Sequence, residues 1–70
     1  MELSARNQLQ GTVASITLGA VMAEVTVDVG GRELTSVITR ASAERMGLAE
    51  GSEVIVVVKA TDVLLGIPSS

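Results

Sequence analysis

Apolar and polar residues alternate along the first half of the chain. Between Val21 and Val29, apolar residues at every second position are separated by Met22, Glu24, Thr26 and Asp28. This period of two predicts a strand with one face in the core and the other in water. Gly11–Leu18 is a second β-prone run. Gly19 and Ala20 lie between the two runs and predict a hairpin turn.

The pattern continues as a strand and then changes to a short helix. Gly30–Gly31 predicts a tight turn, because glycine adopts positive φ angles at no steric cost. Arg32–Thr39 follows as a third strand of the meander. Residues 40–46 then predict a helical segment with Thr39 as its N-cap and Gly47 directly after its last residue.

The last third of the chain holds the most apolar segment. In Glu53–Lys59, every position from Val54 to Val58 is apolar, which is typical of a strand buried on both faces. A domain this small can hardly cover both faces itself, so we expect a partner subunit on one of them. Asp62–Leu65 predicts a final short strand.

The order of these elements predicts the fold class. Five short strands with one small helix between the third and the fourth correspond to an all-β fold with one short helix, a five-stranded OB-like barrel. We see no linker, repeat or low-complexity segment, so residues 1–70 are interpreted as a single domain.

Composition limits how such a domain is stabilised. A 70-residue chain buries only about 60% of its unfolded surface, so a lone monomer is marginal. The chain has no Cys, which excludes disulfides, and without His a structural zinc site is not expected. Its apolar residues include no Phe, Trp or Tyr to fill a large core. Oligomerisation is the remaining way to gain stability.

Charge and hydropathy exclude further classes. A net charge of −3, with five positive residues and no aromatic ring, does not fit nucleic-acid binding, which needs many phosphate contacts and stacking platforms. No apolar stretch reaches the 18 or more residues of a membrane span, and the start does not have the pattern of a signal peptide. We therefore expect a cytoplasmic protein without a membrane partner.

The candidate binding groups are suited to holding an oxyanion. The segment Ser4–Leu9 combines a hydroxyl, a guanidinium (Arg6) and two amides ahead of the first strand. Thr39 and Ser42 place hydroxyls at the predicted helix start, where free N–H groups favour anions. Lys59, the only lysine, closes the apolar strand and adds a second cation.

Each of these residues also has an ordinary structural interpretation. Ser4 can cap a turn, Thr39 can serve only as an N-cap, and Ser42 can be a solvated helix residue. Lys59 can simply protect a strand edge. The arginines at 32, 40 and 45 are interpreted as solvated charges. From the residues alone, both interpretations remain open.

Catalysis has little support. The chain lacks His and Cys, and the carboxylates Glu50 and Glu53 have no partner acid or base at a recognisable spacing. Direct metal ligation by the protein is not expected either, because soft ligands are missing. We predict that the protein is not an enzyme.

Four segments form a combination that covers nearly the whole chain: Ser4–Val13, Gly19–Val25, Val37–Thr39 with Ser42, and Val58–Val63. Together they resemble the molbindin (Mop) family of small molybdate-binding proteins, whose module also occurs as the TOBE domain.

The resemblance implies a cytoplasmic homohexamer, a trimer of dimers, that stores molybdate or tungstate at subunit interfaces without a further cofactor. The ligands that it implies are Ser4, Ala5, Arg6, Thr39, Ser42, Lys59 and Ala60. Ala5 and Ala60 would act through backbone groups only. A second class of oxyanion site is assigned to Gly19, Ala20 and Val21.

An alternative role is an oxyanion-sensing regulatory module that acts on a partner protein. A fused DNA-binding or ATPase domain would mark that role. Because this sequence carries neither, storage for intracellular molybdenum homeostasis is the preferred interpretation.

Overall fold

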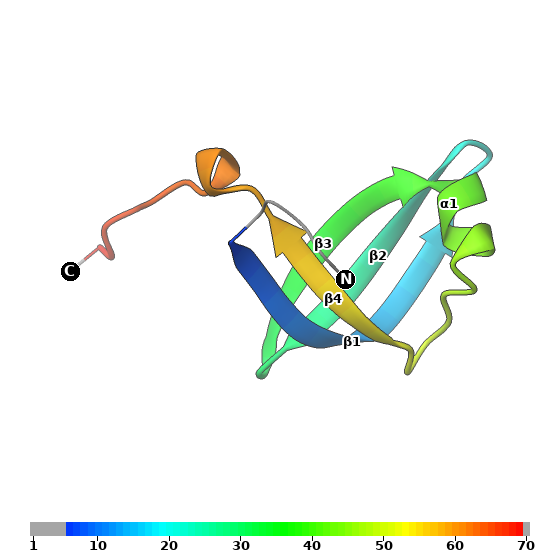
Figure 1. Cartoon of the computed structure of the whole chain (residues 1–70), viewed down its shortest axis with the longest axis horizontal. Coiled ribbons are helices and arrows are strands. Elements are labelled where there is room, and N and C mark those ends of the chain that lie inside the picture. The colour runs from blue at the N-terminus through cyan, green and yellow to red at the C-terminus, as the bar shows by residue number, and fades with distance from the viewer. Residues whose placement is uncertain (1–5, 70) are drawn as a thin grey trace.

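The fold is a curved antiparallel sheet with one short helix at its end (Figure 1). The computed structural model describes residues 6–69. The four strands are β1 (Asn7–Leu18), β2 (Met22–Val29), β3 (Arg32–Thr39) and β4 (Glu53–Val58), with the helix α1 (Arg40–Arg45) between β3 and β4 and a 3-10 turn η1 (Ala60–Asp62) after β4. The order of the strands in the sheet is β3-β2-β1-β4.

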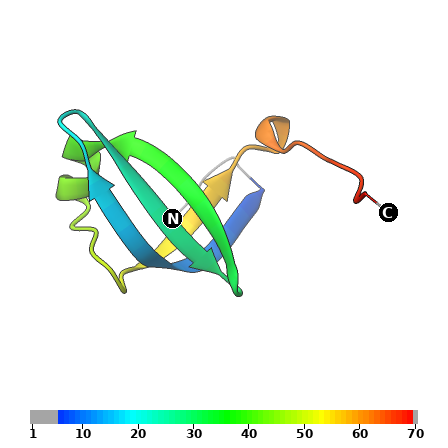
Figure 2. The same cartoon turned by 180° about the vertical axis from the view of Figure 1, so that it is seen from behind.

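Strand β1 is the centre of the sheet because its two halves pair with different neighbours. Its first half pairs with β4, from Asn7 opposite Val58 to Thr12 opposite Glu53, and its second half pairs with β2. The register with β2 shifts between Val13 and Ser15, where β1 contains a bulge. A bulge bends its strand and increases the local twist. The bend brings β4 round toward the side on which β3 lies (Figure 2).

The core lies on the concave face of this sheet. Val13, Val25 and Val27 are buried, and Ile16, Ile38, Leu48, Val54 and Val56 are among the side chains that pack against them. Gly11 is part of this arrangement, because a Cβ there would lie 2.6 Å from Val27 Cγ1 and 2.9 Å from the Asp28 carbonyl oxygen. A larger residue at this position would push β1 away from β2.

Most predictions for the middle of the chain are confirmed. Met22–Val29 buries Ala23, Val25 and Val27, leaves Val29 half-buried and exposes Glu24 and Asp28, whereas Val21 precedes the strand and is 70% exposed. Strand β3 has the predicted bounds. Gly30 and Gly31 form the turn with φ angles of +59° and +87°. Thr39 caps α1, and Gly47 follows the helix with a φ of +64°. Local sequence signals are therefore sufficient to define this half of the fold.

The prediction of a final strand over Asp62–Leu65 is wrong. Ala60–Asp62 forms η1, and residues 63–69 have no regular secondary structure and extend away from the sheet (Figures 1 and 2). Among the described residues, β3 pairs only with β2 and β4 only with β1, so the predicted five-stranded barrel is not closed. Within residues 6–69, no fifth strand pairs with both edge strands, β3 and β4, so the sheet stays open.

The chain itself covers only one face of β4. Val54, Val56 and Val58 are half-buried, whereas Ile55 and Val57 are 47% and 39% exposed. Burial of the second face by a partner subunit stays a prediction. The start of the first strand needs correction, because β1 begins at Asn7 and not at Gly11, so part of the opening polar segment belongs to β1. Lys59 lies just after the end of β4.

Candidate functional site

The hydroxyls of Thr39 and Ser42 meet at the start of α1. The Thr39 hydroxyl accepts from the Ser42 backbone N–H (3.1 Å) and donates to Ser42 Oγ (2.8 Å). Both bonding roles of the Thr39 hydroxyl are thus satisfied within the chain. The hydroxyl hydrogen of Ser42 is still available, since Ser42 Oγ acts only as an acceptor in these contacts. Ser42 is the group at this end that can donate to an incoming anion.

Arg45 adds a positive charge to the same hydroxyl pair. Its Nη2 lies 3.3 Å from Ser42 Oγ and donates to it from the last turn of α1. The contact spans three residues of a helix, the spacing at which side chains become neighbours. The sequence interpretation treated Arg45 as a solvated charge and missed this contact, although its position three residues after Ser42 was the signal that could have revealed it.

The turn of Gly19, Ala20 and Val21 lies against the other side of the helix start. Arg40 connects the two, because its backbone N–H donates to the Val21 carbonyl (2.8 Å) and its Nη1 donates to the Gly19 carbonyl (3.3 Å). The guanidinium of Arg40 is also bonded to Glu44 Oε1 at 2.7 Å. This carboxylate offsets the charge of Arg40, so Arg45 is the cation at this end that no carboxylate among residues 6–69 neutralises.

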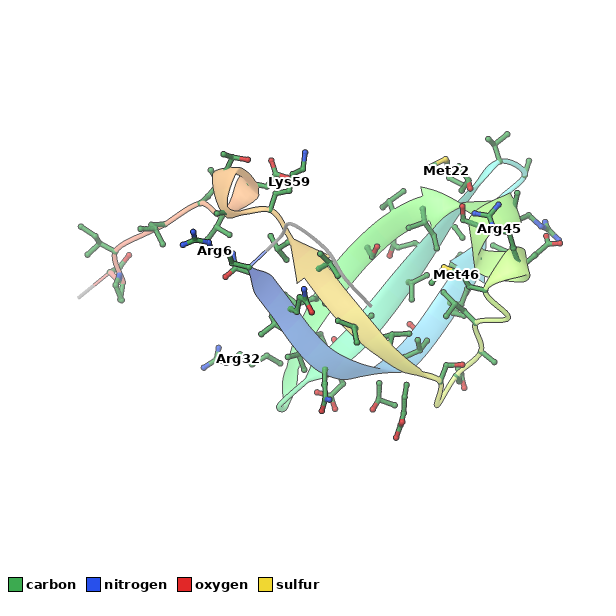
Figure 3. The ribbon with its side chains drawn as sticks, viewed as in Figure 1. Arg6, Met22, Arg32, Arg45, Met46 and Lys59 are labelled. Carbon is green, nitrogen blue, oxygen red and sulfur yellow. The ribbon has the colours of Figure 1, made fainter. Side chains whose placement is uncertain are left out.

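Arg6, Lys59 and Ala60 lie together at a second location. Pairing of Asn7 with Val58 makes Arg6 and Lys59 the next residues beyond the last paired positions of β1 and β4. Within residues 6–69 neither side chain has a hydrogen-bond or ion-pair partner, and both residues are exposed. Their side chains extend in different directions and do not converge on one point (Figure 3).

The predicted ligands therefore form two groups in one chain. Figure 3 shows Arg6 and Lys59 at one end of the sheet and Arg45, whose guanidinium donates to Ser42 Oγ, at the other. Ser4 and Ala5 lie outside the described residues. The hydroxyls supply a neutral donor with a nearby guanidinium, and the opposite end supplies two exposed cations. Neither group alone surrounds an anion.

No group of three or more His, Cys, Asp or Glu side chains in residues 6–69 is arranged to hold a metal ion. In the same part of the chain, no helix has the length and hydropathy needed to cross a membrane.

The described residues form a small domain of four antiparallel strands and one short helix, with a hydroxyl pair at one end and exposed cations at the other. The TOBE domain family matches residues 3–65. Molybdenum-pterin-binding protein 2 of Clostridium pasteurianum is 47% identical over 66 residues, which cover 93% of this chain and 97% of that protein.

Solved structures agree with the sequence comparison. A molybdate-binding protein from Sporomusa ovata superposes with a TM-score of 0.91 at 39% identity, covering 96% of this chain and all of that one. The cytoplasmic molybdate-binding protein ModG, with molybdate bound, gives a TM-score of 0.82 at 49% identity, over 86% of this chain and 43% of that one. The chain belongs to the TOBE domain family, in its group of small molybdenum-pterin-binding (Mop) proteins.

Proposed function

We propose that this protein binds molybdate reversibly at interfaces between copies of itself and stores it in the cytoplasm. Tungstate is proposed as an alternative ligand, because it has the same charge and tetrahedral shape. The likeness to molybdate-binding proteins over almost the full length of the chain supports this assignment. The anion would keep all its oxygens, so that neither a direct bond between metal and protein nor a cofactor is needed.

One observation carries the proposal of an interfacial site. The hydroxyl pair of Thr39 and Ser42 and the cations Arg6 and Lys59 lie at opposite ends of one chain, yet the two groups complement each other chemically. When two copies meet end to end, the exposed cations of one approach the hydroxyl pair of the other. The proposed ligands are Ser4, Ala5, Arg6, Thr39, Ser42, Lys59 and Ala60.

The energetics of such a site are sufficient for useful binding. Each charge-assisted hydrogen bond contributes roughly 1.5–3 kcal/mol, and three or four of them reach about −8 kcal/mol. That free energy corresponds to a dissociation constant of about 1 μM. Because the donors come from different subunits, the anion would also stabilise the assembly by mass action.

The proposed assembly is a homohexamer built as a trimer of dimers, with neither nucleic acid nor membrane as a partner. Its basis is the resemblance to Mop proteins and the incomplete burial of β4 in one chain. The turn of Gly19, Ala20 and Val21, which Arg40 attaches to the helix start, is proposed as a second oxyanion site. Binding and storage, and not catalysis, is the function that these groups support best.

Titration calorimetry with sodium molybdate tests the site directly. Arg6→Ala is expected to weaken binding at least tenfold, because one charge-assisted contact is lost. Arg32→Ala is the matched control, since Arg32 is an exposed arginine on β3 outside both ligand groups, and its affinity should stay within about twofold of the wild type. Equal affinity of Arg6→Ala and the wild type would exclude the opening segment from the site.

A further inference from the structure

The Ser42 hydroxyl has used its capacity to accept hydrogen bonds within the chain. Its Oγ accepts one bond from the Thr39 hydroxyl (2.8 Å) and another from Arg45 Nη2 (3.3 Å). A serine oxygen has two lone pairs for accepting and one proton for donating. With both lone pairs occupied, the bonding capacity that Ser42 has left is the donation of its own proton. Ser42 can therefore serve a ligand only as a donor.

Arg45 is the residue that completes this arrangement. A guanidinium has N–H donors and no acceptor, so its bond with Ser42 has only one possible direction. Without it, one lone pair of Ser42 Oγ would be open to a donor on a ligand. Ser42 Oγ is the only hydrogen-bond partner of the Arg45 side chain within residues 6–69, and no carboxylate in that range forms an ion pair with Arg45. No other described group therefore draws the guanidinium away from Ser42.

Helix geometry keeps the three side chains together. Thr39 is the N-cap of α1, and Ser42 and Arg45 follow at intervals of three residues, the spacing at which side chains on successive turns become neighbours. Figure 3 shows Arg45 on this helix. Arg45 is exposed, whereas Ser42 is half-buried. Partial burial reduces competition from water, so the bonds to Ser42 Oγ are stronger than bonds between fully exposed side chains.

These two contacts also affect the proton that Ser42 donates. A hydroxyl that accepts hydrogen bonds becomes polarised and donates more strongly, because linked hydrogen bonds reinforce one another. A fully deprotonated oxyanion offers only acceptor oxygens and suits such a donor. Hydrogen phosphate would also bring a P–OH donor, for which Ser42 has no lone pair left. Two donors that face each other leave at least one of them unsatisfied, and such a loss is costly in a partly buried site.

The other proposed ligand side chains within residues 6–69 do not supply the missing acceptor. Arg6 and Lys59 carry donors only, and the side chain of Ala60 is apolar. The side-chain oxygens of this group therefore belong to Thr39 and Ser42. Thr39 Oγ1 already accepts from the Ser42 N–H and donates to Ser42 Oγ. Ser42 is the hydroxyl with a free proton, so its bonding state decides whether a proton on the ligand is tolerated there.

We propose that Arg45 is a positioning residue that holds the Ser42 hydroxyl as a donor and thereby makes the site favour fully deprotonated dianions over protonated ones. At neutral pH, molybdate, tungstate and sulfate carry no proton, whereas inorganic phosphate retains at least one. The inference rests on the proposed function, because it concerns the same site, but molybdate binding does not depend on it. Arg45 acts through Ser42 and is not counted among the ligands.

Competition calorimetry on the full chain tests this role. Sodium molybdate is titrated at neutral pH with and without inorganic phosphate, and the phosphate dissociation constant divided by that of molybdate measures discrimination. Arg45→Met removes the donor and should lower this ratio roughly threefold or more, because Ser42 can then accept from a P–OH group. Arg32→Met is the matched control. It removes the same charge from an exposed site on β3, outside both ligand groups, and should leave the ratio unchanged.

A double-mutant cycle shows whether Arg45 acts through Ser42. In a Ser42→Ala background, Arg45→Met should no longer change the ratio, because the hydroxyl that Arg45 orients is absent. An equal decrease with and without the Ser42 hydroxyl would place Arg45 against the anion and overturn the proposal. An unchanged ratio in Arg45→Met also overturns it, while weaker molybdate binding by Arg6→Ala in the same experiments would retain the proposed function. A wild-type chain that binds no molybdate excludes the proposed function instead.

A measurement without ligand decides the contact itself, even if a variant does not fold or the wild type does not bind molybdate. Nitrogen spectra of the isotopically labelled free protein report the Arg45 guanidinium, whose rotation about its Cζ–Nη bonds slows when an N–H group is hydrogen-bonded. We expect separate Nη signals for Arg45 at low temperature in the wild type and a single averaged signal in Ser42→Ala. Averaged signals in the wild type would show that Arg45 does not hold Ser42, and would overturn the proposal.

Discussion

Both ends of the sheet carry groups that can donate hydrogen bonds to an anion, but only those at the helix end are bonded within the chain. At the helix end, Thr39, Ser42 and Arg45 are bonded to one another, and Arg40 ties the neighbouring turn to the helix. At the other end, Arg6 and Lys59 have no hydrogen-bond or ion-pair partner in residues 6–69. Hydrogen bonds within the chain orient the side chains at the hydroxyl end, whereas the side chains at the cationic end have no such contacts. A site that joins the two ends would combine a preorganised half with a flexible half.

This difference predicts which residues affect folding and which affect only binding. The Thr39 hydroxyl caps α1 and bonds to the Ser42 hydroxyl, so its loss should lower both stability and affinity. The cations contact nothing in the described chain, so their loss should lower affinity alone. Measurements at constant protein concentration are needed, because an oligomer gains apparent stability with concentration.

The largest effect is expected at the cationic end. Lys59→Gln should weaken molybdate binding about 10- to 100-fold in calorimetry, since a charge-assisted hydrogen bond contributes roughly 1.5–3 kcal/mol. The thermal midpoint without molybdate should not change, because the side chain is exposed and has no described partner. Lys59→Arg, which retains the charge, is the control. A lower midpoint in Lys59→Gln would show that this end also has a structural role.

Thr39→Ala should affect both properties. Removing the N-cap hydroxyl costs about 1 kcal/mol of unfolding free energy in denaturant titrations, and it releases Ser42 from the contact that orients it. The affinity for molybdate should therefore fall together with the unfolding free energy. Thr39→Ser keeps the capping oxygen and should recover most of the stability. If Thr39→Ala weakens binding but leaves stability unchanged, the hydroxyl end is not the preorganised half.

Arg45→Gln is expected to have the smallest effect. The guanidinium is exposed and touches Ser42 at 3.3 Å, so its loss should change affinity by about two- to fivefold, in line with exposed charge pairs of 0.2–1 kcal/mol. The change should shrink as salt is added, because exposed charges are screened. A loss equal to that of Lys59→Gln would instead place Arg45 in direct contact with the anion.

Local signals in the sequence were sufficient for the fold between Met22 and Gly47. There the alternating valines, the paired glycines and the Thr39 cap each define an element from within a few residues. The start of β1 was missed because three of the four residues in Asn7–Gln10 are polar and do not resemble a strand with one apolar face. The strand predicted over Asp62–Leu65 was wrong because its pattern is apolar but no sheet edge of the described chain receives it.

The candidate site, like the fold, could be predicted from the sequence only in part. Contact between Thr39 and Ser42 could be predicted, since a cap and the third residue after it are neighbours by helix geometry. The joint position of Arg6 and Lys59 depends on the pairing of β1 with β4, which joins residues far apart in sequence. Sequence spacing does not reveal that register. Whether the two groups meet across subunits stays a prediction.

The bulge in β1 contributes to the curvature of the sheet. Ala14 and Ser15 together oppose Thr26, so Val13 and Ile16, three residues apart, both face the core. Deleting Ala14 would restore a regular alternation and keep the same apolar face, but it would remove the bend that a bulge produces. The sheet would flatten, and the edges of β3 and β4 would move apart. One inserted residue thus acts as a spacer that sets how wide the open side of the sheet is.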